Sequence, residues 1–599
     1  MNGSSEEFRI KDGILTRYLG SEEEPVLPEG ITGIGEGAFF LCRTLKRLRI
    51  PEGVSFIGDR AFEYCRALEE LILPDTVTRI GVHAFHRCEA LAGLSLPPGL
   101  LSLGDGAFSR CGSLRSLRIP EGVRRIGRKL CSRCSGLREL ILPAGTESVG
   151  ERAFALCRSL TAVRLPAGLR ELGRGAFAFC ERLERVEIPP GLTRLEEQVF
   201  SSCSALRGLS LPEGLTEIGA DAFAFCSSLE ELQIPDSVES LGARAFFRCA
   251  ALARIRLPRR VKALGERLFF SCSRLEELAI PEGVTAVAPG MFSGCSRLRR
   301  VEIPDGVTAI DPRAFFSCAA LEQVKLPESL VYVEEKAFSG CRSLRGLSLP
   351  GKLYRLGCYA FSGSGLVELV VPDSVEHMSG GLFSRCSDLR SVSLPAKLDR
   401  IESYLFYSCP SLEGLKLPET VVSIGAYAFS LSGLKQIELP SSLKTILPYA
   451  FQYCNQLGSL RIPEGVTRIG KGAFSSCKQL ASVTLPSSLP VLEDNLFSGC
   501  TGLRRAAIPE GVTRIEDSAF EGCRSLTQVT IPGTVTGLGV QAFFSCGLES
   551  VELREGVTEL GRLAFANCRY LRHVSLPASL TLIPIGVFSG CPDLCLQPR

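Results

Sequence analysis

A repeat of 23 residues dominates this sequence and constrains its fold more than any other feature. The segment AFFLC at residues 38–42 returns as AFEYC at 61–65, and related segments recur almost to the end of the chain. A phenylalanine column of 25 positions runs from Phe39 to Phe588 and is interrupted at Cys131. Such a period predicts one small structural unit per repeat, which buries its apolar residues by stacking on its neighbours.

One repeat can be read residue by residue. The segment LKRLRI at 45–50 predicts a short strand whose inward residues are two apart at its end. Pro51 has no N–H to donate and should end that strand. Gly58 permits a tight turn, and DRAFEYC at 59–65 is expected to make about one helical turn. Strands of successive repeats should pair in parallel. We expect the parallel sheet on the inner face of a curved stack and short helical turns on the outer side.

The repeat LxxLxIPxxVxxIGxxAFxxC resembles the leucine-rich repeats of the BspA-like family from about Pro25 to Leu596. The resemblance implies an α/β fold, a right-handed leucine-rich-repeat solenoid of about 25 coils of 23 residues that binds other macromolecules. Residues 1–25 are predicted to form an N-terminal capping hairpin around Asp12 and Gly13, and residues 26–599 the solenoid. The final segment CPDLCLQPR shows no polar cap, so end-to-end self-association through an uncapped C-terminal coil is also considered.

Charge and hydrophobicity exclude several kinds of partner. The chain has 68 basic and 65 acidic residues, interspersed, with a net charge of +3. This balance is not typical of a nucleic-acid-binding protein. No apolar run approaches the ~20 residues of a membrane span, so we expect no membrane insertion. The segment MNGSSEEFRIKDGILTRYLG lacks the apolar core of a signal peptide and favours a cytoplasmic location. A processed fragment could instead come from a cell-surface or secreted protein.

Cysteine forms a column of its own. Of the 26 cysteines, 23 lie three residues after the phenylalanine column. Stacked identical positions are poorly placed for disulfides, so we interpret them as buried free thiols that act as small hydrophobes in a reducing compartment. Cys131 and Cys134 form a CxxC, but Leu130 stands in the alanine column beside Cys131, which indicates a volume exchange rather than a redox pair. Cys358 and Cys595 lie outside the column and are predicted to be exposed.

Catalytic and metal-binding patterns are weak. His83, His86 and Cys88 are close in sequence, but the column of His83 is predicted to face solvent while Cys88 faces the interior. We find no Ser/His/Asp arrangement, no phosphate-binding glycine-rich loop and no supported pair of carboxylates. The sequence therefore predicts a protein that is not an enzyme and needs no cofactor or metal.

Two surfaces are candidate binding sites for a protein or peptide. The first is made of charged residues that flank the central strand leucine, where arginine suits carboxylates of a partner: Arg47, Arg49, Glu70, Arg118, Arg164, Arg185, Glu231, Arg254, Arg256 and Arg300. The second is a column of tyrosines two residues before phenylalanine: Tyr359, Tyr404, Tyr427 and Tyr449. Tyrosine is common in interface hot spots. We predict a non-catalytic protein-binding scaffold; the alternative is a cell-surface adhesin or antigen that binds host macromolecules.

Overall fold

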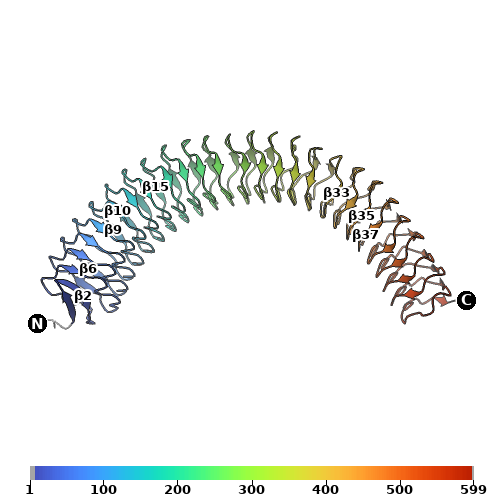
Figure 1. The fold of residues 1–599 in the computed structure, drawn as a ribbon, viewed down its shortest axis with the longest axis horizontal. Helices are drawn as coiled ribbons and strands as arrows, with labels where there is room; N and C mark the ends of the chain where they lie inside the picture. Colours follow the sequence, from blue (N-terminus) through green and yellow to red (C-terminus); the bar gives the residue numbers. More distant parts are fainter. Residues whose placement is uncertain (1–6, 597–599) are drawn as a thin grey trace. The chain divides into compact units, whose positions relative to one another are not determined.

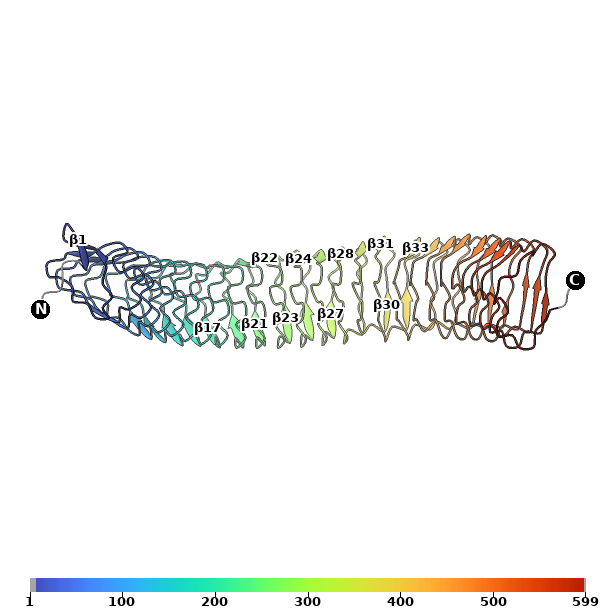
Figure 2. The same ribbon diagram turned by 90° about the horizontal axis from the view of Figure 1, so that it is seen from below.

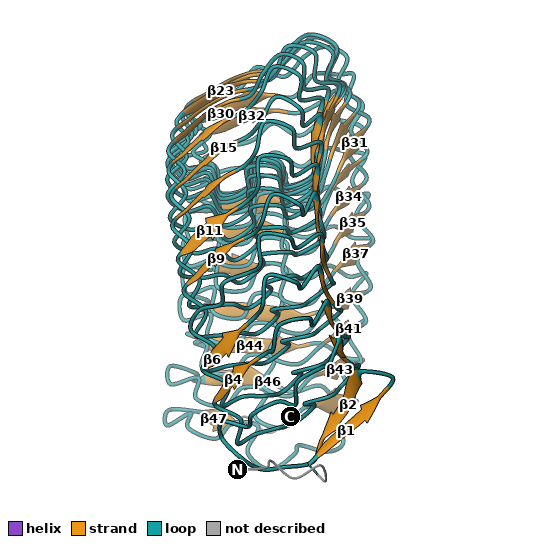
Figure 3. Ribbon diagram, turned by 90° about the vertical axis from the view of Figure 1, so that its left-hand side faces the viewer, coloured by secondary structure: helices purple, strands orange, loops and turns teal. Residues whose placement is uncertain are grey.

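The structure is a computed structural model that describes residues 7–596. The chain divides into two units, Met1–Gly306 and Val307–Arg599, and each is described by itself. Within each unit, short coils are stacked one after another along the chain (Figure 1). The described residues form strands and turns, and no helix is found among them. Most coils contribute to two strand rows, which lie on opposite sides of the coil (Figure 3).

The first strand row consists of the segments that precede the proline column. In the first unit these strands are β4 (Arg47–Arg49), β6 (Glu70–Ile72), β9 (Ser116–Arg118), β11 (Glu139–Ile141), β13 (Ala162–Arg164), β15 (Arg185–Glu187), β17 (Gly208–Ser210), β19 (Glu231–Gln233), β21 (Arg254–Arg256), β23 (Glu277–Ala279) and β25 (Arg300–Glu302). In the second unit they are β27 (Gln323–Lys325), β30 (Glu368–Val370), β32 (Ser391–Ser393), β36 (Ser459–Arg461), β38 (Ser482–Thr484), β40 (Arg505–Ala506), β42 (Gln528–Ile531), β44 (Ser550–Leu553), β46 (His573–Ser575) and β47 (Cys595–Leu596).

The second strand row precedes the AFxxC turn. In the first unit it contains β3 (Gly33–Ile34), β5 (Phe56–Ile57), β7 (Arg79–Ile80), β8 (Ser102–Leu103), β10 (Arg125–Ile126), β12 (Ser148–Val149), β14 (Glu171–Leu172), β16 (Arg194–Leu195), β18 (Glu217–Ile218), β20 (Ser240–Leu241), β22 (Ala263–Leu264) and β24 (Ala286–Val287). In the second unit it contains β26 (Ala309–Ile310), β28 (Tyr332–Val333), β29 (Arg355–Leu356), β31 (His377–Met378), β33 (Arg400–Ile401), β34 (Ser423–Ile424), β35 (Thr445–Ile446), β37 (Arg468–Ile469), β39 (Val491–Leu492), β41 (Arg514–Ile515), β43 (Gly537–Leu538) and β45 (Glu559–Leu560).

The two rows correct the expectation of one sheet on an inner face. Within each unit they run along opposite edges of the stack (Figure 2). Neighbouring strands in both rows pair in parallel; for example, Arg47 lies opposite Glu70 in the first row, and Ile57 opposite Ile80 in the second. The second row forms because the segment before the turn stays extended and its backbone groups need partners in the next coil.

A hairpin precedes the first full coil. β1 (Phe8–Lys11) and β2 (Ile14–Tyr18) pair antiparallel, and the turn between them places Asp12 and Gly13 at φ values of 53° and 75°. β2 then pairs in parallel with β3 of the second row. The hairpin therefore supplies backbone partners to the first strand of that row.

The AFxxC segments are turns, so the prediction of short helical turns is wrong. In the coil of Phe62, Arg60 and Tyr64 have left-handed φ values of 53° and 64°, which a right-handed helix does not accept. Cys65 N still donates to Phe62 O (3.1 Å), but Phe62 N donates to Ala84 O of the next coil (2.7 Å). The turn segments thus form a hydrogen-bonded ladder between coils, and their N–H groups are not available for an α-helix.

The phenylalanine and cysteine columns form the core. Consecutive phenylalanine rings stack within each unit; the centroids of Phe39 and Phe62 are 4.9 Å apart, and those of Phe338 and Phe361 are 5.7 Å apart. Cysteine contributes more than apolar volume, because Cys65 Sγ donates a hydrogen bond to Phe39 O of the preceding coil (3.0 Å). The same contact recurs along the column, so the buried thiols also hold neighbouring coils together.

The three shortened repeats share a glycine where the chain is one residue short. A Cβ atom at Gly365, Gly433 or Gly547 would lie 2.0 Å from a carbonyl oxygen of the preceding coil. Real Cβ atoms do not approach an oxygen so closely, so the shorter turn requires glycine at this position. Ser364 and Ser432 occupy the cysteine column in two of these repeats, and their hydroxyls lie 3.4 and 3.3 Å from the next cysteine sulfur.

Candidate binding surfaces

The first strand row presents charged side chains on both sides of a buried apolar residue. In β4, Leu48 is buried while Arg47 and Arg49 are exposed, because successive side chains of a strand point to opposite faces. The same geometry applies to every residue predicted for this surface, and all are exposed: Arg47, Arg49, Glu70, Arg118, Arg164, Arg185, Glu231, Arg254, Arg256 and Arg300. They are distributed over many coils rather than gathered at one point.

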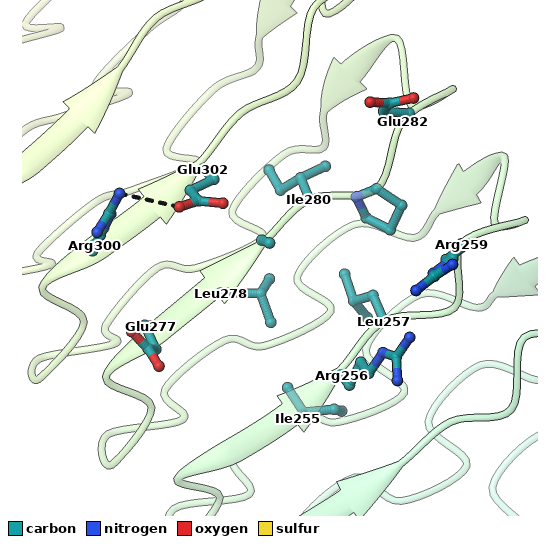
Figure 4. Close-up of a pocket in the computed structure, with 12 residues that line it drawn as sticks. Ile255, Arg256, Leu257, Arg259, Glu277, Leu278, Ile280, Glu282, Arg300 and Glu302 are labelled. Atoms are coloured by element: carbon teal, nitrogen blue, oxygen red, sulfur yellow. Dashed lines mark ion pairs between the residues drawn. The ribbon is translucent and has the colours of Figure 1, made fainter.

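A groove of about 690 Å³ crosses the first row over β21, β23 and β25. Ile255, Leu257, Leu278 and Ile280 form its apolar floor (Figure 4). β21 pairs with β19, and β23 pairs with β25, but the ladder of the first row is interrupted between β21 and β23. The interruption lies within the groove.

Opposite charges stand on the two sides of this groove. Arg256 and Arg259 lie on one side, and Glu282 and Glu302 on the other (Figure 4). Arg300 forms an ion pair with Glu302, with Nη2 and Oε1 3.2 Å apart. The groove can therefore accept a segment that carries both an acidic and a basic side chain.

The sequence analysis named part of this groove. Arg256 and Arg300 belong to the predicted set, whereas Arg259 and Glu282 were missed. The missed residues lie in the turns that follow Pro258 and Pro281, so a signal was present in the residues next to the proline column. The repeat pattern did not show that residues of these turns line the groove.

Further hollows lie over the same strand row. In the first unit, one of about 480 Å³ is lined by Arg47, Arg49 and Glu70; Arg47 there pairs with Glu24 (2.9 Å) and Glu70 (3.7 Å). In the second unit, one of about 1010 Å³ lies over β30 and β32. Its lining includes Val370, whose exposed fraction is 69%.

Three of the four tyrosines predicted for the column lie together in the structure. The rings of Tyr404, Tyr427 and Tyr449 stack at centroid distances of 5.0 and 4.9 Å. Burial and the neighbouring tyrosines raise the pKa of Tyr427. Tyr359 is separated from this stack because Gly381 stands in the intervening coil, and the Tyr359 ring occupies the space beside that glycine. The column therefore presents one stack of three tyrosines and one separate ring.

The histidine pair does not form a metal site with Cys88. The rings of His83 and His86 are 5.1 Å apart, but Cys88 points inward and donates from Sγ to Phe62 O (3.2 Å). Burial lowers the pKa of His86 to about 4, with further lowering by His83, Arg110 and Arg87. Across residues 7–596, no cluster of three histidine, cysteine or acidic side chains is placed to hold a metal ion.

The CxxC segment takes part in the core. Cys131 and Cys134 are both fully buried. Cys134 Sγ donates to Phe108 O (2.9 Å), and Cys131 O accepts a hydrogen bond from Cys157 Sγ (3.2 Å). Cys131 thus takes the place of a phenylalanine in the ladder, with Leu130 buried beside it.

Comparison with known proteins identifies the repeat. Segments of the chain match the BspA type leucine-rich repeat region (six copies) at residues 18–138, 124–253, 216–345, 262–390, 308–432, 380–504 and 493–595. The chain belongs to this family. No match was found among curated protein sequences.

Solved structures with similar folds come from several bacteria. A leucine-rich repeat protein from Bacteroides ovatus is 24% identical over 74% of this chain and 92% of its own, with a TM-score of 0.43. A leucine rich cell surface protein from Faecalibacterium prausnitzii is 20% identical over 96% of this chain and 95% of its own, with a TM-score of 0.24. The T. pallidum leucine-rich repeat protein is 27% identical over 38% of this chain and 91% of its own, with a TM-score of 0.22.

Location and self-association stay predictions. Within residues 7–596, the structure contains no helix of the length and apolarity that a membrane span requires. The comparisons do not support the cytoplasmic location predicted from the sequence. The last coil exposes Leu582 and Ile585, with exposed fractions of 73% and 96%, and this is the surface on which end-to-end self-association would depend.

Proposed function

We propose that this chain is a non-catalytic scaffold that binds a partner protein through an extended segment lying in the groove over β21, β23 and β25. The observation that carries the proposal is the apolar floor of Ile255, Leu257, Leu278 and Ile280 between walls of opposite charge. Leucine-rich-repeat solenoids are extended surfaces suited to such binding.

The charged side chains on the two sides of the groove indicate what kind of partner segment could bind there. Arg256 and Arg259 can hold a carboxylate through their planar guanidinium groups. Glu282 lies across the groove from them (Figure 4) and can hold a basic side chain. A segment with an acidic residue, an apolar residue and a basic residue would therefore match the site.

Selection from random peptides tests this match directly. Random dodecapeptides are displayed on phage and selected on the immobilised full chain, and enriched peptides are then measured by isothermal titration calorimetry. The variant Arg256→Ser/Arg259→Ser removes one wall. The control variant Arg128→Gln/Arg174→Gln changes the charge equally on a different side of the coils.

Enriched peptides are expected to carry both charges and an apolar residue. Their affinity should fall by about tenfold or more in the groove variant and remain unchanged in the control. Peptides that bind the wild type and the groove variant equally would place the binding surface elsewhere. Failure to enrich any peptide would argue against recognition of an extended segment.

The tyrosine column is a second proposed surface, on the basis of its three stacked rings. Replacing Tyr404 and Tyr427 with Ser should abolish binding of a partner that uses this column, because the large aromatic contact area is lost. The fold should persist, since neither residue lies in the phenylalanine core. Circular dichroism checks the fold, and unchanged binding of all selected peptides would contradict a role for these tyrosines.

A further inference from the structure

A second column of exposed and half-buried side chains lies two residues after phenylalanine in the first seven coils. In chain order it contains Leu41, Tyr64, Arg87, Arg110, Arg133, Leu156 and Phe179. Three consecutive arginines are thus bordered by apolar or aromatic residues on both sides. Leu41 and Phe179 have exposed fractions of 43% and 44%, so both ends of the column reach solvent.

The backbone aligns these side chains. Arg87 N donates to Ser109 O (2.9 Å), Arg110 N to Ser132 O (2.8 Å) and Arg133 N to Ala155 O (2.7 Å). All three arginines have left-handed φ values, from 61° to 65°, and therefore leave their turns in the same direction. The coil spacing here is close to 5 Å, as the 5.4 Å between the rings of Phe85 and Phe108 shows.

Among the residues that the structure describes, Arg87, Arg110 and Arg133 have no carboxylate partner, in contrast to several other arginines of this unit. Arg66, Arg158 and Arg174 each form an ion pair with a glutamate one coil away. Within the described part of the chain, no carboxylate lies within ion-pair distance of Arg87, Arg110 or Arg133. Burial, together with the neighbouring charges of Arg87 and Arg133, lowers the pKa of Arg110.

Nearby polar groups also lack partners. Arg87 Nε, His83 Nδ1 and His86 Nδ1 are buried atoms without a hydrogen-bond partner among the described residues. Arg87 Cζ lies 5.1 Å from the centre of the Tyr64 ring, which holds the first guanidinium at the aromatic end of the row. A row of like charges that is held together by the backbone favours an anionic ligand, because the ligand relieves the repulsion.

We propose that the column from Leu41 to Phe179 binds an extended acidic segment of a protein, whose carboxylates meet Arg87, Arg110 and Arg133. Hydrophobic residues on either side of the carboxylates contact the two ends of the column. This inference goes beyond the groove over β21, β23 and β25, because it concerns other coils and a different side of them.

The length of the charged row favours a short acidic segment over a long polyanion. Carboxylates lie in the same or neighbouring coils as the row: Glu89, which pairs with Arg66, acts electrostatically on Arg110, and Glu151 pairs with Arg128. A nucleic acid or a sulfated polysaccharide that continued along the surface would meet these carboxylates or the apolar ends. Six steps of about 5 Å between coils span about 30 Å, which is the length of about nine extended residues.

The test uses fluorescence anisotropy with the full chain. The labelled probe is the nonapeptide Leu-Phe-Glu-Ser-Glu-Ser-Glu-Phe-Leu, and its control carries glutamine in place of each glutamate. The variant Arg87→Asn/Arg110→Asn/Arg133→Asn removes the row, and asparagine tolerates the left-handed backbone. The matched control Arg128→Asn/Arg158→Asn/Arg174→Asn removes the same charge from arginines that have glutamate partners.

The glutamate peptide should bind the wild type and the matched control with similar affinity. We expect binding about tenfold weaker or more for the row variant, and likewise for the glutamine peptide on the wild type. Equal binding of the two peptides, or of the two variants, would overturn the proposal. It would also be overturned if a heparin fragment bound through these arginines while the glutamate peptide did not bind.

Discussion

At the scale of single residues, cysteine suits its column because it is small, apolar and a weak donor. Its side chain fits beside the stacked phenylalanines, and its thiol reaches a backbone carbonyl of the coil before it. In the coil of Phe246, Cys249 Sγ donates to Phe223 O (3.1 Å), which also accepts from Cys226 N (3.1 Å). Where cysteine occupies the column, its thiol therefore adds a hydrogen bond between neighbouring coils.

This role predicts different effects of two substitutions at Cys249. Cys249→Ala should lower the free energy of unfolding by about 1 kcal/mol, because it removes the hydrogen bond and leaves a small cavity. Cys249→Ser should cost less, because the hydroxyl can donate to the same carbonyl, and Ser364 and Ser432 occupy this column naturally. Urea denaturation measures both variants. Equal loss in the two variants would contradict a hydrogen-bonding role.

His86 predicts a pH dependence of stability. Its pKa is about 4 in the folded chain, below the ordinary value of 6.5, because of burial and the neighbouring His83, Arg110 and Arg87. Between these values the unfolded chain binds more protons, so the contribution of His86 to stability falls as the pH is lowered from 6.5 towards 4. His86→Gln should therefore reduce the loss of melting temperature between pH 7.5 and pH 5.

The control for this prediction is His573→Gln, because His573 is exposed. Its melting temperatures should follow those of the wild type at both pH values. If His86→Gln also left the pH dependence unchanged, the histidine would not be the group responsible.

At the scale of the structural element, the turn decides how much the repeat can vary. In a turn of normal length, backbone N–H groups donate hydrogen bonds to the next coil, as Phe62 N does to Ala84 O. A shortened repeat keeps this ladder, since Phe429 N donates to Ala450 O (2.8 Å). It absorbs the missing residue at a glycine that approaches the preceding backbone. A one-residue deletion is therefore compatible with the stack only where a side chain is absent.

Gly433 tests this requirement. Gly433→Ala places a Cβ atom 2.0 Å from Pro410 O, so the coil must shift, and we expect a loss of about 1–3 kcal/mol in the free energy of unfolding. Gly414→Ala is the control, because no atom lies within 4 Å of its Cβ position. It should change stability by no more than about 0.5 kcal/mol. Similar behaviour of the two variants in urea denaturation would contradict the argument.

At the scale of the whole molecule, the stack separates the thiols into accessible and inaccessible groups. Cys358 and Cys595 are exposed, Cys42 and Cys591 are half-buried, and the remaining cysteines are buried. Burial raises the pKa of column thiols, for example that of Cys226 to about 12. A thiol such as Cys226 stays protonated near neutral pH, and burial protects the column thiols from reagents.

Thiol titration with a coloured disulfide reagent should therefore show two fast thiols in the native chain. Cys42 and Cys591 should react more slowly, and the others only after unfolding in denaturant. The variant Cys358→Ser/Cys595→Ser should remove the fast phase and lower by two the total number of thiols that react after unfolding. Fast reaction of many thiols in the native chain would contradict a closed stack.

The sequence by itself determined the features that repeat in every coil. The phenylalanine and cysteine columns, the strand before proline and the exposed charges that flank Leu48 follow from the 23-residue period, because the same local pattern is written many times. Leu130 and Cys131 could also be recognised as a volume exchange, since each stands in a known column. The family follows from the same repeat.

The tertiary structure decided the features that depend on the next coil. The turns are not helical because their N–H groups bond to the following repeat, and a single repeat does not show that partner. The groove over β21, β23 and β25 is formed by residues of successive coils, and its Arg259 and Glu282 come from the turns after Pro258 and Pro281. The arginine row exists because stacking places residues 23 apart at a spacing near 5 Å, so charges distant in sequence become neighbours.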